Sequence, residues 1–266
     1  TNQMGIFNKI YLKTTEEVEL IKESARIVGL TLAEVAKHIK PGVPCQYLDR
    51  IAEEFIRDHH AVPSFKGYNG YPASLCISIN DVVVHGIPHS NFLKEGDIVS
   101  VDCGAYKNGY HGDYAYTFAV GEISNEKQLL VDRTRESLYK GIEAAKKGNH
   151  IGDIGHAIQS YVESFGYGVV RELVGHGIGK NMHEKPDVPN FGKPGKGELI
   201  VPGMVFCIEP MINMGTHRVS MDRDQWTIRT LDRKPSAHFE HQLAVTSTGT
   251  ILLSTYEYIE EVLQKK

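Results

Sequence analysis

The sequence has few cysteines and no long apolar run. Its 4 cysteines form neither a CxxC pair nor the dense spacing of a disulfide scaffold. This pattern favours a cytoplasmic protein with reduced thiols. No apolar run approaches the roughly 20 residues that a membrane-spanning helix requires, and the first residues lack the apolar core of a signal peptide. We therefore expect no membrane partner and no secreted disulfide fold.

An excess of charge of one sign is also missing. The 266 residues include 29 lysines and arginines against 33 aspartates and glutamates, a formal net charge of −4 at pH 7. No broad basic field is present to attract nucleic acid, so no direct nucleic-acid site is expected. The hydrophobic content of 41% and the charged content of 23% are those of an ordinary globular protein.

Helical and strand-like patterns alternate along the chain. Helices are predicted over about 14–39, 47–58, 125–147 and 152–165, and strands over 74–84 and 98–118. Thr14 and Glu17 have the spacing of a capping box at the start of the first helix. No low-complexity linker interrupts the pattern, which predicts a single domain over 4–266. Residues 1–3 precede Met4 and are interpreted as an addition to the natural start.

Two segments of the sequence resemble each other. When Gly96 is aligned with Gly203, "LKEGDIVSVDCG" falls on "IVPGMVFCIEPM" and Asp102 falls on Glu209. Upstream, "KPGVPCQYLDRIAEEFI" matches "KKGNHIGDIGHAIQSYV" at nearly the same offset of about 106 residues, too long for a solenoid repeat. We therefore predict two pseudo-symmetric halves, about 14–120 and 124–250, each bringing one strand-end carboxylate to a shared centre.

The stretch "IVSVDCGAYKNGYHGDYAYTF" places two aspartates within otherwise apolar strands. Asn108-Gly109 is a strong hairpin signal, and a turn there pairs Asp102 with Ala115. Asp113 then lies diagonally from Asp102 on the same face, roughly 7–8 Å away at the backbone. Two carboxylates that close require a proton or a cation. The alternative is an aspartate pair on a solvated sheet face.

Three further segments carry metal-donor side chains. His176 lies between two glycines in "VGHGIGKNMHEKP", Glu209 ends an apolar strand in "FCIEPMI", and Glu240 alternates with apolar residues in "AHFEHQLAVT". Each is a weak signal alone, because a lone histidine is more often structural and Glu240 reads equally well as a solvated carboxylate. Together with Asp102 and Asp113 they form an oxygen-rich set with one imidazole. Such a set suits a pair of divalent ions such as Mn, Fe, Co or Zn.

Five motifs resemble those of the type I methionine aminopeptidases in order and spacing. They are "GYNGYPASLCISINDVVVHGIP" (67–88), "VDCGAYKNGYHGD" (101–113), "VVRELVGHGIGKNMHEKP" (169–186), "PGMVFCIEPM" (202–211) and "FEHQLAVT" (239–246). The resemblance runs from about Met4 to Ile259. It implies an α/β pita-bread fold around a central antiparallel sheet, in agreement with the internal repeat. It also implies removal of the N-terminal methionine from nascent polypeptides and peptides with a small second residue.

The resemblance also implies roles for individual residues. The two-metal site would consist of Asp102, Asp113, His176, Glu209 and Glu240. A hydroxide bridging the two ions would attack the first peptide carbonyl, with Glu209 as general base. His85 and His183 would hydrogen-bond the substrate and the tetrahedral intermediate.

A methionine pocket follows from the same resemblance, because a thioether needs an apolar, polarizable lining. Its walls would be Phe65, Tyr68, Tyr71, Cys76, Met182 and Trp226. Met182 stands where an aromatic residue is common in the family and Phe65 where a smaller cysteine is common. Both departures affect the shape of the pocket, and the loop 220–226 is longer than the usual turn. The family positions around a monovalent cation match Asn80, Val82 and Ser236.

Other readings of the same donor set stay open. X-prolyl aminopeptidases share the fold and the five donors, although they typically add an N-terminal domain. Some pita-bread proteins are binding modules that have lost the metal site, whereas all five donors are present here. Type II methionine aminopeptidases insert a helical subdomain before the last glutamate, and the short segment 210–239 argues against one. The resemblance further implies docking to the ribosome and a monomeric state.

Overall fold

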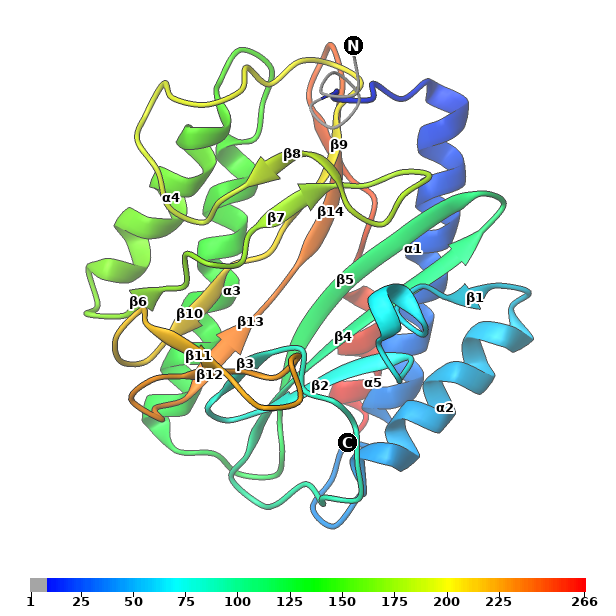
Figure 1. Cartoon of the computed structure of the whole chain (residues 1–266), viewed down its shortest axis with the longest axis vertical. Helices are drawn as coiled ribbons and strands as arrows, with labels where there is room; N and C mark the ends of the chain where they lie inside the picture. The colour runs from blue at the N-terminus through cyan, green and yellow to red at the C-terminus, as the bar shows by residue number, and fades with distance from the viewer. Residues whose placement is uncertain (1–8) are drawn as a thin grey trace.

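The structure is a computed structural model that describes residues 9–266, shown in Figure 1. The expectations about residues 1–3 and Met4 lie outside the described residues. The helices are α1 (Thr15–Ala36), α2 (Cys45–Asp58), the short η1 (Tyr68–Gly70), α3 (Asn125–Ala144), α4 (Ile151–Glu163) and α5 (Glu257–Gln264). Of the residues described, none forms a helix with the length and apolar character needed to cross a membrane.

The strands pair antiparallel throughout the described part of the chain. One sheet contains β1 (Val62–Pro63), β2 (Leu75–Ile79), β4 (Ile98–Lys107) and β5 (Tyr110–Ala119). A second has the order β15 (Thr250–Leu252), β14 (His241–Val245), β9 (Val205–Ile208), β7 (Gly175–Gly177) and β8 (Glu184–Val188). Two smaller sheets contain β13 (Ser236–His238), β10 (Met211–Asn213) and β6 (Gly168–Val169), and β11 (Val219–Met221), β12 (Ile228–Thr230) and β3 (Val82–Val84).

The hairpin of β4 and β5 has the predicted register. Asn108 and Gly109 both have positive φ angles, 52° and 83°, as a type I′ turn requires. Gly104 lies opposite Asp113, so Asp102 and Asp113 are diagonal neighbours on one face of the pair. The turn residues and the strand alternation together were therefore sufficient to place both carboxylates.

Helix α1 packs against the β4–β5 hairpin, and its capping box is present as predicted. The Thr14 hydroxyl accepts from the amide of Glu17 at 3.2 Å, and the Glu17 carboxylate accepts from the amide of Thr14. Gly112 of β5 lies so close to this helix that a Cβ there would be 2.5 Å from the amide nitrogen of Ala25. In Figure 1, α1 and α2 lie on the hairpin side of the molecule, whereas α3 and α4 lie on the opposite side.

The two large sheets meet at Ala115 and Glu240. The amide of Glu240 donates to the carbonyl oxygen of Ala115 at 3.1 Å. The hydroxyl of Tyr256 lies 2.8 Å from the carbonyl oxygen of Ala115 and 2.7 Å from that of Glu240. Apolar side chains from both sheets and their helices form one continuous core. This junction brings a residue of the C-terminal sheet next to the aspartate hairpin.

Several elements differ from the sequence-based prediction, and α1 ends at Ala36 and not near 39. The strand expected over 74–84 is two strands, β2 and β3, because Asn80 adopts a left-handed φ of 53° and turns the chain. Helix α3 ends at Ala144 and not near 147. At this end, the side chain of Asn149 donates to the carbonyl oxygen of Ala144 at 2.9 Å. Helix α5 was not predicted, and Tyr256 at its start makes no side-chain cap hydrogen bond.

Candidate active site

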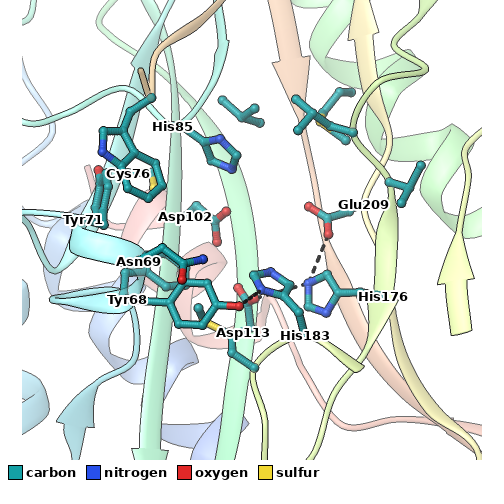
Figure 2. Close-up of a pocket in the computed structure, with 17 residues that line it drawn as sticks. Tyr68, Asn69, Tyr71, Cys76, His85, Asp102, Asp113, His176, His183 and Glu209 are labelled. Atoms are coloured by element: carbon teal, nitrogen blue, oxygen red, sulfur yellow. Dashed lines mark hydrogen bonds and ion pairs between the residues drawn. The ribbon is translucent and has the colours of Figure 1, made fainter. Parts of the chain in front are cut away.

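Two carboxylates of the site come from the β4–β5 hairpin. Asp113 on β5 is 3% exposed, and its backbone amide donates to the side-chain oxygen of Gln242 at 3.1 Å. Asp102 on β4 is partly exposed and lines the same cavity as Asp113. Figure 2 shows both side chains projecting from the hairpin into the cavity.

His176 lies on β7, where its flanking glycines are required by close strand packing. A Cβ at Gly175 would lie 2.2 Å from the carbonyl oxygen of Cys207, and one at Gly177 would lie 2.2 Å from that of Lys185. The Nδ1 of His176 is 2.9 Å from the carbonyl oxygen of Gly177. Because a carbonyl can only accept, Nδ1 carries the proton and Nε2 is left to face the carboxylates.

Two glutamates complete the cluster from the C-terminal half of the chain. Glu209 follows the end of β9, where the side-chain amide of Asn190 donates to its carbonyl oxygen at 3.1 Å. Glu240 lies between β13 and β14 and is fully buried, at 0% exposure. The reading of Glu240 as a solvated carboxylate is therefore wrong, because the junction with Ala115 encloses it.

The five predicted donors lie together. Donor atoms of Asp102, Asp113 and Glu240 all lie within 4.8 Å of one another, and so do those of overlapping groups that include His176 and Glu209. Nε2 of His176 is 3.5 Å from Asp113 Oδ2 and 3.3 Å from Glu209 Oε1 (Figure 2).

The oxygens of this cluster fit a cation. One oxygen each of Asp102 and Asp113, and both oxygens of Glu240, are buried without any hydrogen-bond partner. Buried carboxylate oxygens that lack donors are costly, and a divalent ion is the group that would compensate for them. The set therefore has the donor composition of a metal site, and its buried oxygens lack the partners that a metal ion would supply.

Burial and mutual repulsion set the protonation of the carboxylates. Burial, with the nearby charges of Asp113 and Glu209, raises the pKa of Asp102 well above its usual range. Burial and the charge of Asp113 likewise raise the pKa of Glu240. Burial acts in the same direction on Glu209, but the close imidazoles of His176 and His238 outweigh it and lower the pKa to about 2. The cluster therefore holds protons that a bound cation would displace.

The histidines divide into one cationic and two neutral side chains at neutral pH. Burial lowers the pKa of His176, but hydrogen bonding to Asp113 and Glu209 prevails and raises it to about 10. Burial and the charge of His176 lower the pKa of His183 to about 4. Burial also lowers the pKa of His85. His85 and His183 are thus neutral near pH 7 and can each donate one ring N–H.

An apolar cavity of about 320 Å³ opens beside the donor cluster. All eight predicted substrate-binding residues line it: Phe65, Tyr68, Tyr71, Cys76, His85, Met182, His183 and Trp226. The Tyr71 and Trp226 rings pack edge to face at 5.0 Å between centroids. The hydroxyl of Tyr68 lies 2.9 Å from Nδ1 of His183 (Figure 2). The cavity therefore joins an apolar wall to the polar cluster, as a site for a hydrophobic side chain next to a reacting bond requires.

The loop before Trp226 has a defined conformation. One carboxylate oxygen of Asp224 accepts from the amides of Trp226 and Thr227, both at 2.8 Å, and the other accepts from the Thr227 hydroxyl at 2.6 Å. Gln225 adopts a left-handed φ of 67°. The longer loop therefore closes on Asp224 and presents the Trp226 ring to the cavity.

The residues predicted to surround a monovalent cation lie apart from this cavity. The amide of Ser236 donates to the carbonyl oxygen of Asn80 at 2.9 Å, and Val82 begins β3. The ammonium of Lys127 is 2.7 Å from the carbonyl oxygen of Gly96 and 3.3 Å from the side-chain oxygen of Asn80. A protein cation therefore already contacts this region.

Sequence reasoning missed two polar residues of the site. His238 lies 3.3 Å from Glu209, and Gln242 accepts from the amide of Asp113. The alternation that indicated Glu240 also contains their signal, because residues 238, 240 and 242 share the period of two. The apolar half of the alternation begins at Phe239, so His238 lies just outside the run that marks Glu240.

Comparison with known proteins agrees with the geometry. Residues 19–247 match the model of metallopeptidase family M24. A methionine aminopeptidase of Clostridium acetobutylicum is 53% identical over 93% of this chain and 100% of its own length, and methionine aminopeptidase 1 of Bacillus subtilis is 52% identical over 92% and 99%. The crystal structure of methionine aminopeptidase from Rickettsia prowazekii superposes with a TM-score of 0.92 at 38% identity, covering 93% of this chain and 100% of that one.

The close superposition confirms the predicted pita-bread fold. The family match also confirms that the protein is a metallopeptidase, which agrees with the unpartnered carboxylate oxygens beside the apolar cavity. The chain belongs to metallopeptidase family M24.

Proposed function

We propose that the protein removes the N-terminal methionine from peptides and nascent polypeptides whose second residue is small. The observation that carries this proposal is the apolar cavity that opens directly onto five clustered metal donors. A methionine side chain in the cavity brings the first peptide bond to the cluster. The relatives named methionine aminopeptidase, at 52% and 53% identity, support the same activity.

The donor set would hold two divalent ions drawn from Mn, Fe, Co and Zn. The proposed donors are Asp102, Asp113, His176, Glu209 and Glu240. When bound, the ions supply Lewis-acid activation of the attacking water and of the peptide carbonyl. A monovalent cation near Asn80, Val82 and Ser236 belongs to the same proposal.

Glu209 is the proposed general base. Its pKa is lowered to about 2 in spite of burial, because the imidazoles of His176 and His238 lie against its carboxylate. The side chain is therefore ionised at neutral pH and can take the proton of the attacking water. It then gives this proton to the amine that leaves as the new N-terminus.

His85 and His183 are the proposed donors to the substrate. Both are neutral near pH 7 because burial lowers their pKa values, so each offers a ring N–H without adding charge. These N–H groups would bind the carbonyl oxygen more strongly as negative charge develops on it. The hydroxyl of Tyr68 fixes the ring of His183 by its contact at Nδ1.

The cavity wall is proposed to select methionine and to exclude water. Phe65, Tyr71, Cys76 and Met182 form one buried apolar cluster, with Trp226 packed against it. Aromatic rings and sulfur atoms are polarizable, and they suit a thioether better than a charged or branched polar side chain. The departures at Phe65 and Met182 change the shape of this wall and leave it apolar.

The cellular setting is part of the proposal as well. Four buried, unpaired cysteines fit a reducing compartment such as the cytoplasm. There a monomer could act on nascent chains while docked to a ribosome. Since the donors come from both predicted halves, we propose that residues 4–266 act as a single catalytic unit.

Hydrolysis of two peptides tests the proposed function. Metal-stripped protein is incubated with Met-Ala-Ser and with Ala-Pro-Ala, with and without added Mn²⁺ or Co²⁺, and the products are read by mass spectrometry. We expect loss of methionine only, and only with metal. Cleavage of the prolyl peptide alone would identify an X-prolyl aminopeptidase instead. No cleavage of either peptide by metal-loaded protein would indicate a binding module.

A further inference from the structure

His238 is a buried histidine that has so far appeared only as a neighbour of Glu209. It ends β13, and its side chain is 1% exposed. The backbone is held on both sides by Thr117, whose hydroxyl donates to the His238 carbonyl at 2.6 Å and lies 3.0 Å from its amide. The position of the imidazole is therefore fixed by the sheet rather than by its own polar contacts.

The Nε2 atom of this imidazole points at the carboxylate cluster without a hydrogen-bond partner. It lies 3.3 Å from Glu209 Oε2, yet the contact lacks the alignment of a hydrogen bond, and Nε2 remains unpartnered. A ring nitrogen of His238 also lies within 4.8 Å of donor atoms of both Glu209 and Glu240. Both oxygens of Glu240 are unpartnered too. Nε2 of His238 and both carboxylate oxygens of Glu240 are therefore buried polar atoms without a hydrogen-bond partner in one cluster.

The spacing within the cluster is compatible with donors that share one ion. The contacts of His176 and His238 with carboxylate oxygens are 3.3–3.5 Å long. Two donors that share an ion, each about 2.1 Å from it, lie about 3.0–3.4 Å apart at the usual bond angles. The contacts of 3.3–3.5 Å in the cluster are close to this separation.

We propose that His238 is a sixth donor to the metal site, binding through Nε2 beside Glu209 and Glu240. The inference rests on the proposed metal site and adds a second imidazole to it. An imidazole ligand favours Fe, Co and Zn over Mn, whereas carboxylate ligands also suit Mn. His238 therefore makes the site bind Fe, Co and Zn in preference to Mn.

The substitution His238→Gln separates ligation from mere orientation of Glu209. Glutamine keeps a side-chain N–H that can hydrogen-bond to Glu209, but it lacks the imidazole. We expect H238Q to bind Co²⁺ about 10-fold or more weakly at one of the two ions, with a smaller loss for Mn²⁺. The visible absorption of the Co²⁺-loaded protein should change as well. Unchanged Co²⁺ affinity and spectrum in folded H238Q would overturn the proposal.

His241→Gln is the matched control. His241 is also buried, but its ring contacts Ser254 at 2.6 Å and Tyr139 at 3.2 Å and is not among the clustered donors. We expect H241Q to keep the wild-type Co²⁺ spectrum even if its melting temperature falls. A spectral change in H241Q equal to that in H238Q would show that destabilisation of the surrounding fold causes both changes. It would overturn the assignment of His238 as a ligand.

A measurement on the wild-type protein keeps the inference testable if H238Q does not fold. X-ray absorption fine structure of Co²⁺-loaded wild-type protein counts the imidazoles bound to the ions. We expect a second imidazole in addition to His176, and a single one would overturn the role of His238. Failure of the wild-type protein to bind Co²⁺ at all is a different result, because it would overturn the proposed metal site itself.

Discussion

The hydroxyl of Tyr68 contacts one of the two imidazoles that are proposed to bind the substrate. It lies 2.9 Å from Nδ1 of His183, and this hydrogen bond holds the plane of the imidazole ring. Tyr68 is held by the η1 turn, in which Gly67 and Asn69 adopt left-handed φ angles of 85° and 49°. The phenol therefore reaches His183 from a turn of fixed shape.

Tyr68→Phe should lower kcat and leave KM for Met-Ala-Ser nearly unchanged. A neutral hydrogen bond is worth about 0.5–1.5 kcal/mol, so we expect a roughly 3- to 10-fold loss in kcat. Steady-state kinetics with the metal-loaded variant gives the measurement. Tyr106→Phe is the control, because Tyr106 is a half-exposed ring on β4 that does not line the cavity. An equal loss in both variants would contradict the role of Tyr68.

Among the structural elements, the segment before α1 secures the loop that carries Met182 and His183. Lys13 lies 2.6 Å from Glu184, and each side chain is 4% exposed. The other carboxylate oxygen of Glu184 accepts from the amide of Asn181 at 3.1 Å, which closes the loop around Met182 and His183. The buried carboxylate of Glu184 is thus paired with a lysine far away in the sequence.

Lys13→Met should destabilise the protein by about 3 kcal/mol or more, because it leaves the Glu184 carboxylate buried without its partner. Denaturant unfolding measures the loss, and the double variant K13M/E184Q should recover part of it by removing the charge. Lys185→Met is a control on the same loop, because the Lys185–Asp187 pair is exposed, and we expect a change below about 0.5 kcal/mol. A loss of similar size in Lys185→Met would show that the burial of the pair is not the cause.

Local signals predicted the elements well, but they could not predict the contacts between distant elements. The Asn108-Gly109 turn and the strand alternation determined the register of β4 and β5, so both aspartates were placed correctly. The contact of Tyr68 with His183 joins residues 115 positions apart, and no local pattern contains it. The residue patterns indicated the five donors and the resemblance to a family gave them their roles, whereas the burial of Glu240 required the junction of two sheets.

For the whole molecule, stability should depend on pH and metal together. Burial raises the pKa values of Asp102 and Glu240 in the folded, metal-free protein. Their stabilising contribution is therefore complete below their ordinary pKa values near 4 and is lost as pH rises through the raised values. Metal-free protein should lose stability from these two groups as the solution becomes more alkaline.

The increase in melting temperature caused by Co²⁺ should consequently be larger at pH 8 than at pH 5. Metal binding must displace the protons of Asp102 and Glu240, which is easier at the higher pH. Thermal melts of stripped and reloaded protein across this range provide the measurement. An increase that is independent of pH would show that the two carboxylates are already ionised in the metal-free fold.

The hydrogen bond from the amide of Glu240 to Ala115 gives this protein a built-in reporter. That proton is shielded from water only while the aspartate hairpin and the C-terminal sheet remain in contact. Its rate of exchange with deuterium thus measures how often the hairpin and the C-terminal sheet separate at Ala115 and Glu240. Ions bound between donors of the hairpin and of the C-terminal sheet should slow this exchange. One backbone amide would then report whether the metal site is occupied, without any substrate present.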